Sequence, residues 1–217
     1  MPGPIPIVAP EVARYLAAFL PPRDPLLARL EAEAGREGVP IVPPETAAFL
    51  DLVVRMIQPE RVLEVGTAIG YSGIVIARAM PSWGILDTIE LDIPTAARAQ
   101  ANFVEAGLKG RVLVWKGPAI EVMKQLQNRY DVVFIDAAKE EYLAYLALAL
   151  PLLPSGASVI VDNLLWGGRV VTGPEDEPLY QKTTPAIQEF NRVFLAHPEL
   201  RSTILPVGDG IGLGVKV

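Results

Sequence analysis

The stretch of sequence that decides the fold reads Val62-Leu63-Glu64-Val65-Gly66-Thr67-Ala68-Ile69-Gly70-Tyr71-Ser72-Gly73. An apolar, β-rich run passes through a glycine-bearing loop into a segment with helical spacing, as in the repeating unit of parallel α/β sheets. Such a loop points backbone N–H groups at a ligand on the carboxyl edge of the sheet. The sequence therefore predicts a ligand-binding loop at residues 66–70.

The same strand-then-helix alternation continues through the following hundred residues. Strands are predicted at residues 61–65, 85–90, 112–115, 131–135 and 157–161, with helices at 71–80, 93–106, 118–128 and 139–150. Runs such as VVFI and SVIV are continuously apolar rather than alternating, which is typical of strands buried on both faces. We therefore expect a parallel sheet with helices on both faces.

Both ends of the chain add to this unit. A helix at 184–196 precedes strands at 202–207 and 211–217, and the Gly208-Asp209-Gly210 turn between those strands is short enough to force antiparallel pairing. Three N-terminal helices are predicted at 10–20, 24–37 and 44–57. The expected fold is a Rossmann-like, seven-stranded, mostly parallel sheet with an antiparallel last strand. We expect one domain over 1–217, in which 1–57 form a lid or dimer segment on a core at 58–217.

Composition limits the chemistry that the chain can carry out. It has no cysteine and one histidine, so a metal would have to be held by oxygen. A net charge of −6 provides no general attraction for nucleic acid. The first ten residues lack a secretory pattern and no apolar run could span a membrane, so we expect a soluble, cytoplasmic protein. A mean hydropathy of +0.32 predicts a homodimer, with contacts in the N-terminal helices and residues 170–182.

The glycine loop indicates which cofactor it binds. The dinucleotide pattern G-x-G-x-x-G fails, because Ala68 and Tyr71 occupy its second and third glycine positions. The loop instead matches the E-x-G-x-G-x-G pattern of S-adenosylmethionine methyltransferases, with Ala68 as the middle residue. Glu90 ends the second strand, where an acidic side chain can accept hydrogen bonds from both ribose hydroxyls.

Oxygen ligands gather at the ends of two later strands. Asp136 follows FI at residues 134–135, and Asp162-Asn163 follow IV at 160–161. Carboxyl ends of parallel strands meet at one edge, so these side chains should converge there. Two carboxylates and an amide oxygen suit a hard cation, with Mg²⁺ as first choice and Mn²⁺ or Ca²⁺ as alternatives. Separately, Asp136 could cap a helix, and Asp162-Asn163 could form a turn.

Four motifs in order, GTAIGYSG, FIDAAKEEY, VDNLLWGG and ILPVGDG, make residues 40–217 resemble the catechol and caffeoyl-CoA type of O-methyltransferase. The resemblance implies a metal held by Asp136, Asp162 and Asn163, and catalysis by Lys139 with Asp136, Lys139 assisting deprotonation of the acceptor. It implies cofactor contacts from Glu64, Gly66, Thr67, Ser72, Glu90, Ala119 and Asp136. GTAIGYS and DAAK are most similar to the bacterial branch that methylates 5-hydroxyuridine in tRNA. Val42-Pro43 depart from the plant pattern and argue against a phenylpropanoid-CoA acceptor.

The expected function is therefore metal-dependent methyl transfer from S-adenosylmethionine to a hydroxyl, either of 5-hydroxyuridine in tRNA or of a small catechol. Two alternatives stay open at this point. One is a nicotinamide-dependent oxidoreductase on a related fold, because fold alone does not fix function. The other is a non-catalytic relative that only binds the cofactor.

Overall fold

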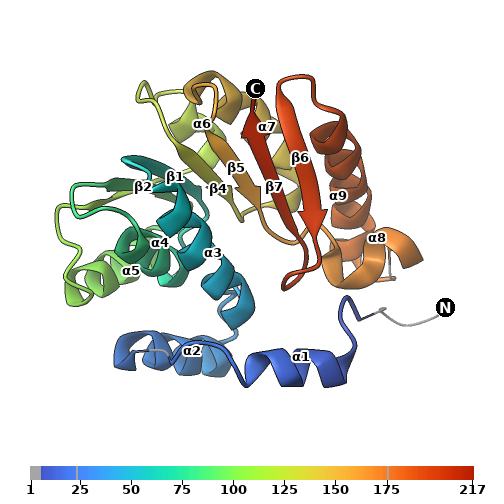
Figure 1. The fold of residues 1–217 in the computed structure, drawn as a ribbon, viewed down its shortest axis with the longest axis horizontal. Coiled ribbons are helices and arrows are strands. Elements are labelled where there is room, and N and C mark those ends of the chain that lie inside the picture. The colour runs from blue at the N-terminus through green and yellow to red at the C-terminus, as the bar shows by residue number, and fades with distance from the viewer. Residues whose placement is uncertain (1–5, 23, 175) are drawn as a thin grey trace.

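The computed structural model describes residues 6–22, 24–174 and 176–217, and a seven-stranded sheet runs through its centre (Figure 1). The strands are β1 (Arg61–Val65), β2 (Ile85–Glu90), β3 (Val112–Lys116), β4 (Val132–Ile135), β5 (Ser158–Val161), β6 (Leu200–Leu205) and β7 (Ile211–Lys216). They are arranged in the order β3-β2-β1-β4-β5-β7-β6. Neighbours are parallel except at β7, which is antiparallel to both β5 and β6. The predicted fold class is confirmed.

Helices cover both faces of this sheet, as the continuous apolar strands predict. One core contains side chains of α2 (Pro25–Glu37), α3 (Pro44–Ile57), α4 (Tyr71–Ala79) and α5 (Ile93–Glu105). The other contains side chains of α6 (Ala119–Met123), α7 (Tyr142–Ala149) and α9 (Pro178–Ala196). Val62 belongs to the first core and Leu63 to the second, because successive strand residues point to opposite faces.

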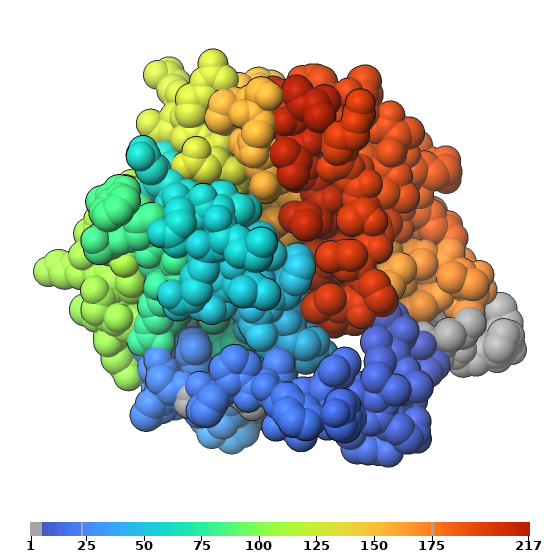
Figure 2. Space-filling model, viewed as in Figure 1, coloured from blue at the N-terminus to red at the C-terminus, as the bar shows by residue number. Residues whose placement is uncertain are grey.

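The first two helices extend along one margin of the molecule (Figure 2). Asp24 caps α2 by accepting the Leu27 N–H, and the buried face of α2 includes Leu30. Arg98 of α5 pairs with Glu33 and Glu37, which fixes α2 against the core. By contrast, α1 (Pro10–Ala17) has no buried residue. No helix in the described part of the chain is long and apolar enough to cross a membrane.

Several predicted boundaries are wrong, for identifiable reasons. β6 ends at Leu205 rather than at residue 207, because Pro206 has no N–H to continue the ladder. α9 starts at Pro178 rather than at 184, with Pro185 inside the helix instead of in its first turn. α6 ends at Met123 rather than at 128, after which the chain turns to bury Leu126 and Tyr130.

Short elements complete the chain. The predicted helix at 139–150 is divided into a 3₁₀ turn, η1 (Lys139–Glu141), followed by α7 and then η2 (Leu150–Leu152). The connection after β5 contains η3 (Trp166–Gly168) and α8 (Arg169–Thr172). Of these segments, η1, η3 and α8 lie at or beside the carboxyl edge of the sheet, where the candidate site is formed, whereas η2 precedes β5 at the opposite edge.

Candidate active site

Gly66 allows the loop after β1 to approach the end of β4. Its φ is +104°, and a Cβ placed there would lie 1.9 Å from the Asp136 backbone oxygen. Only glycine fits such a conformation at such a separation. The loop therefore lies directly against the segment that carries Asp136, and this contact joins two parts of the predicted site.

Glu64 lies fully buried beneath this loop within a hydroxyl network. Ser72 Oγ and Thr88 Oγ1 each donate to its carboxylate at 2.6 Å, and Thr67 Oγ1 lies 2.6 Å from Thr88 Oγ1. Burial raises the pKa of Glu64 to about 7 in spite of these donors. Since a nearby positive charge would favour the carboxylate form, the network suits a cationic ligand.

Glu90 at the end of β2 fixes the loop as well as facing the cavity. Its Oε2 accepts the Ala68 N–H at 2.8 Å and its Oε1 accepts the Asp92 N–H at 2.9 Å. The sequence predicted only a contact with ribose hydroxyls. The additional bond to Ala68, whose φ is 45°, shows that Glu90 also holds the strained middle of the glycine loop.

A cavity of about 620 Å³ opens at this edge. The predicted site residues that line it are Gly66, Thr67, Ser72, Glu90, Ala119, Asp136 and Lys139. Glu64 lies beneath it, whereas Asp162 and Asn163 are not part of its lining. Residues 38–42, which connect α2 to α3, form a further wall that the sequence did not predict.

Asp162 and Asn163 follow β5, the strand beside β4. Ile135 of β4 pairs with Val161 of β5, so Asp136 and Asp162, the residues that come next, leave the sheet side by side. Asp162 is 1% exposed; its Oδ1 accepts the Asn163 N–H, while its Oδ2 is buried without a hydrogen-bond partner. Burial, and next the charge of Asp136, raise the pKa of Asp162 to about 7. A buried carboxylate oxygen with no donor, beside a second carboxylate, is suited to a cation.

Asp136 and Lys139 form an ion pair in the part of the cavity wall that follows β4. Lys139 Nζ donates to Asp136 Oδ1 at 2.7 Å, and the same ammonium lies 5.1 Å from the Tyr142 ring and 5.9 Å from the Trp166 ring. Asp136 caps no helix, because the residue at the cap position of η1 is Ala138. Asn163 does adopt a turn conformation, with a φ of 63°.

Within the described residues, no three His, Cys, Asp or Glu side chains gather as a metal cluster. A cation here would therefore depend on two carboxylates and the amide of Asn163, which is the oxygen set that the sequence predicted. Asp209, which the sequence did not assign to the site, lies beside them: it accepts hydrogen bonds from the Asn163 side chain and the Gly167 N–H. The ILPVGDG motif was the signal that could have identified it.

A parallel sheet with a glycine loop, a buried acid under that loop and a second acid at the next strand end is the arrangement that the sequence predicted for a site that binds S-adenosylmethionine. The family model described as O-methyltransferase matches residues 24–217. The chain therefore belongs to the O-methyltransferase family.

Individual relatives agree with this assignment. The catechol O-methyltransferase of Niastella koreensis is 37% identical, over 88% of this chain and 90% of that protein. Caffeoyl-CoA O-methyltransferase 2 of Petunia hybrida is 31% identical, over 76% of this chain and 72% of that protein. The solved structure of the O-methyltransferase TomG from Streptomyces achromogenes, in complex with S-adenosylmethionine, superposes with a TM-score of 0.84 at 30% identity and covers 95% of this chain and 96% of that chain.

The protein is thus an S-adenosylmethionine-dependent O-methyltransferase of the catechol and caffeoyl-CoA type. This decides against the nicotinamide-dependent oxidoreductase that the sequence left open.

Proposed function

We propose that the protein transfers a methyl group from S-adenosylmethionine to one hydroxyl of a small catechol-type acceptor, with a divalent cation held by Asp136, Asp162 and Asn163. The observation that carries the proposal is the buried, unpartnered Oδ2 of Asp162 beside the charge of Asp136. Mg²⁺ fits this oxygen set best, with Mn²⁺ or Ca²⁺ as alternatives. When bound, such a cation acidifies a hydroxyl and holds neighbouring acceptor oxygens in place.

The cofactor is proposed to lie in the 620 Å³ cavity, between the glycine loop and Glu90. The residues proposed to contact it are Glu64, Gly66, Thr67, Ser72, Glu90, Ala119 and Asp136. Glu64, through Ser72 and Thr88, fixes the floor, and its negative charge complements the sulfonium. Methyl transfer forms the acceptor O–C bond while the S–C bond breaks, so alignment of the two reactants contributes much of the rate.

Lys139 is proposed to receive the proton that the acceptor hydroxyl loses, for which its ammonium must first give up a proton and become the neutral amine. Its Nζ is 2.7 Å from Asp136 Oδ1, so a proton-exchanging group lies directly beside the carboxylate proposed for the cation. The rings of Tyr142 and Trp166 restrict where this side chain can go. Only 13% of the Lys139 side chain is exposed, which limits exchange of the proton with bulk water.

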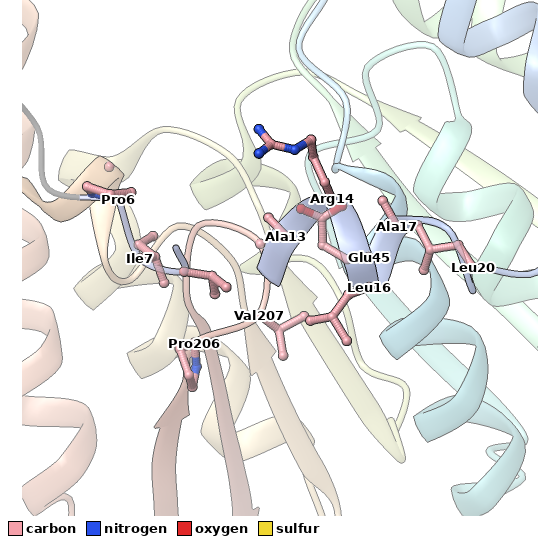
Figure 3. Close-up of a pocket in the computed structure, with 13 residues that line it drawn as sticks. Pro6, Ile7, Ala13, Arg14, Leu16, Ala17, Leu20, Glu45, Pro206 and Val207 are labelled. Atoms are coloured by element: carbon pink, nitrogen blue, oxygen red, sulfur yellow. The ribbon is translucent and has the colours of Figure 1, made fainter. Parts of the chain in front are cut away.

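A second cavity, lined mainly by apolar residues, is an argument for a small acceptor with an apolar body. It has a volume of about 810 Å³ and is lined by Gly167 and the β6–β7 turn on one side and by α1 on the other. Figure 3 shows α1 beside that turn, with Leu16 directed toward Val207. Among the described residues that line it, Arg14 is the only lysine or arginine, and it is largely exposed and pairs with Glu11. A tRNA backbone would require more cationic partners than this.

We expect methyl transfer to a simple catechol, and we expect EDTA to abolish it and excess Mg²⁺ to restore it. The measurement is transfer of label from S-adenosylmethionine to catechol and, in parallel, to tRNA bearing 5-hydroxyuridine. Faster labelling of the tRNA would replace the catechol proposal with the tRNA acceptor. Activity that survives EDTA would overturn the metal proposal, and labelling of neither acceptor would overturn the catechol proposal as well as the tRNA alternative.

We further propose that residues 1–57 form the lid or dimer contact of a single methyltransferase domain over 1–217, and the exposed apolar side chains support the dimer contact. On α1, Val12 and Tyr15 are 49% and 65% exposed at a spacing that places them on one helix face. Phe19, two residues after the end of α1, is 71% exposed, and its ring lies 4.9 Å from that of Tyr15. Within 170–182, Val171 is 77% and Leu179 54% exposed. A second copy would cover such an apolar surface, as the hydropathy of the sequence predicted.

For the dimer, sedimentation velocity at micromolar concentration should give twice the 23.4 kDa chain mass. The double variant Val12→Asp/Phe19→Asp should sediment as a monomer, because it places charge in the contact. Trp83→Asp is the matched control, since Trp83 is 70% exposed but lies in the α4–β2 connection. A monomeric wild-type protein would contradict the proposal.

A further inference from the structure

Asp209 holds two points of the loop that carries the proposed metal residues. It lies in the turn between β6 and β7, in the ILPVGDG motif, and neither the cofactor nor the metal proposal uses it. Its Oδ1 accepts the Gly167 N–H, and its Oδ2 accepts from Asn163 Nδ2 at 3.4 Å. One carboxylate thus joins a side chain and a backbone group that are four residues apart.

The loop that it holds has an unfavourable backbone conformation. Asn163 and Trp166 have φ angles of 63° and 49°, and Gly167 and Gly168 follow with 59° and 80°. Residues with a Cβ seldom keep positive φ unless their surroundings enforce it. The same β6–β7 turn supplies that enforcement, since Leu164 N–H donates to Gly210 O and Leu165 N–H to Asp209 O, both at 2.9 Å.

The bond from Asn163 to Asp209 also decides which end of the amide remains available. A carboxylate accepts hydrogen bonds and an amide nitrogen donates them, so the nitrogen of Asn163 faces Asp209. The amide oxygen is then the end that can face a cation. With the amide reversed, an N–H₂ group would face the cation and an oxygen would face the carboxylate, and both contacts would be repulsive.

We propose that Asp209 is a positioning residue that fixes the amide of Asn163 so that its oxygen is presented to the cation; this rests on the metal site of the proposed function. It acts through Asn163 rather than by touching the reacting atoms. A partner of this kind orients a ligand in advance, and losing it typically weakens metal affinity by about 10- to 100-fold.

A donor–acceptor exchange between the two residues tests this role. In Asp209→Asn, the oxygen of the new amide accepts the hydrogen bond from the Gly167 N–H. Its nitrogen then faces Asn163, whose amide must reverse. In the double variant Asn163→Asp/Asp209→Asn, the amide at 209 donates to the carboxylate at 163, which keeps its other oxygen for the cation. The double variant therefore again directs an oxygen of residue 163 toward the cation, which the single variant does not.

The experiment measures binding of Mn²⁺ to the full chain by the electron paramagnetic resonance signal of the free ion, together with the thermal midpoint of each variant. We expect Asp209→Asn to bind Mn²⁺ about 10- to 100-fold more weakly and the double variant to return to within a few-fold of wild type. Asp131→Asn is the matched control. Asp131 Oδ2 likewise accepts two N–H groups, those of Glu60 and Arg61, but at the opposite edge of the sheet.

The outcomes separate this inference from the proposed function. Wild-type protein that binds no Mn²⁺ overturns the metal site and the role of Asp209 together. Wild-type binding with unchanged affinity in Asp209→Asn overturns the role of Asp209 alone. A weakened single variant that the second substitution does not rescue also overturns it, because a merely structural carboxylate would behave in that way.

Discussion

Replacing Asp162 with alanine should reduce methyl transfer by about a thousandfold or more while leaving S-adenosylmethionine affinity nearly unchanged. Loss of the proposed cation removes several kcal/mol of stabilisation from the charge that develops on the acceptor oxygen. The cofactor should be unaffected because Asp162 is not part of the cavity lining. The measurements are initial rates, analysed as kcat/KM for the acceptor, and calorimetric titration with the cofactor.

The fold should tolerate this change. The carboxylate of Asp162 is buried near Asp136 and its Oδ2 has no donor, so its removal relieves repulsion. Asp51→Ala, which removes an exposed carboxylate paired with Arg55 on α3, is the control.

In wild-type protein, Mn²⁺ binding should weaken as the pH falls through about 7, because protonated Asp162 cannot serve as a ligand.

Replacing Glu90 with alanine should have the reverse effect, weakening cofactor binding about 10- to 100-fold while Mn²⁺ still binds. Hydrogen bonds to a charged group contribute about 1.5–3 kcal/mol, and the proposed ribose contacts are of this kind. The variant also releases the Ala68 N–H, so the glycine loop loses its anchor. Calorimetry gives the cofactor affinity, and Mn²⁺ titration of the same sample gives the metal affinity.

Glu60→Ala is the control for Glu90, since Glu60 is an exposed acid that precedes β1 at the other edge of the sheet. Asp136→Ala should combine both defects, because Asp136 lines the cavity and is also a proposed metal ligand. If Asp162→Ala lost cofactor affinity as severely as Glu90→Ala, the division into a cofactor region and a metal region would have to be abandoned.

The sequence by itself determined the sheet and which residues stand at its carboxyl edge. Continuous apolar runs require strands covered on both faces, and the residue that follows each run, such as Asp136 or Asp162, must then lie at that edge. The antiparallel last strand followed from a three-residue turn. These features depend on neighbours in the chain, so a linear pattern is sufficient to predict them.

Contacts between segments far apart in the chain were decided only by the tertiary structure. The wall formed by residues 38–42, the bond from Ala68 to Glu90 and the bond from Asn163 to Asp209 each join separate elements. Polar side chains at such places satisfy whichever groups packing brings near them, and several partners are compatible with the same sequence pattern. The sequence could therefore place Asp209 in a turn, but only the packing of that turn against the loop after β5 gave its carboxylate a partner.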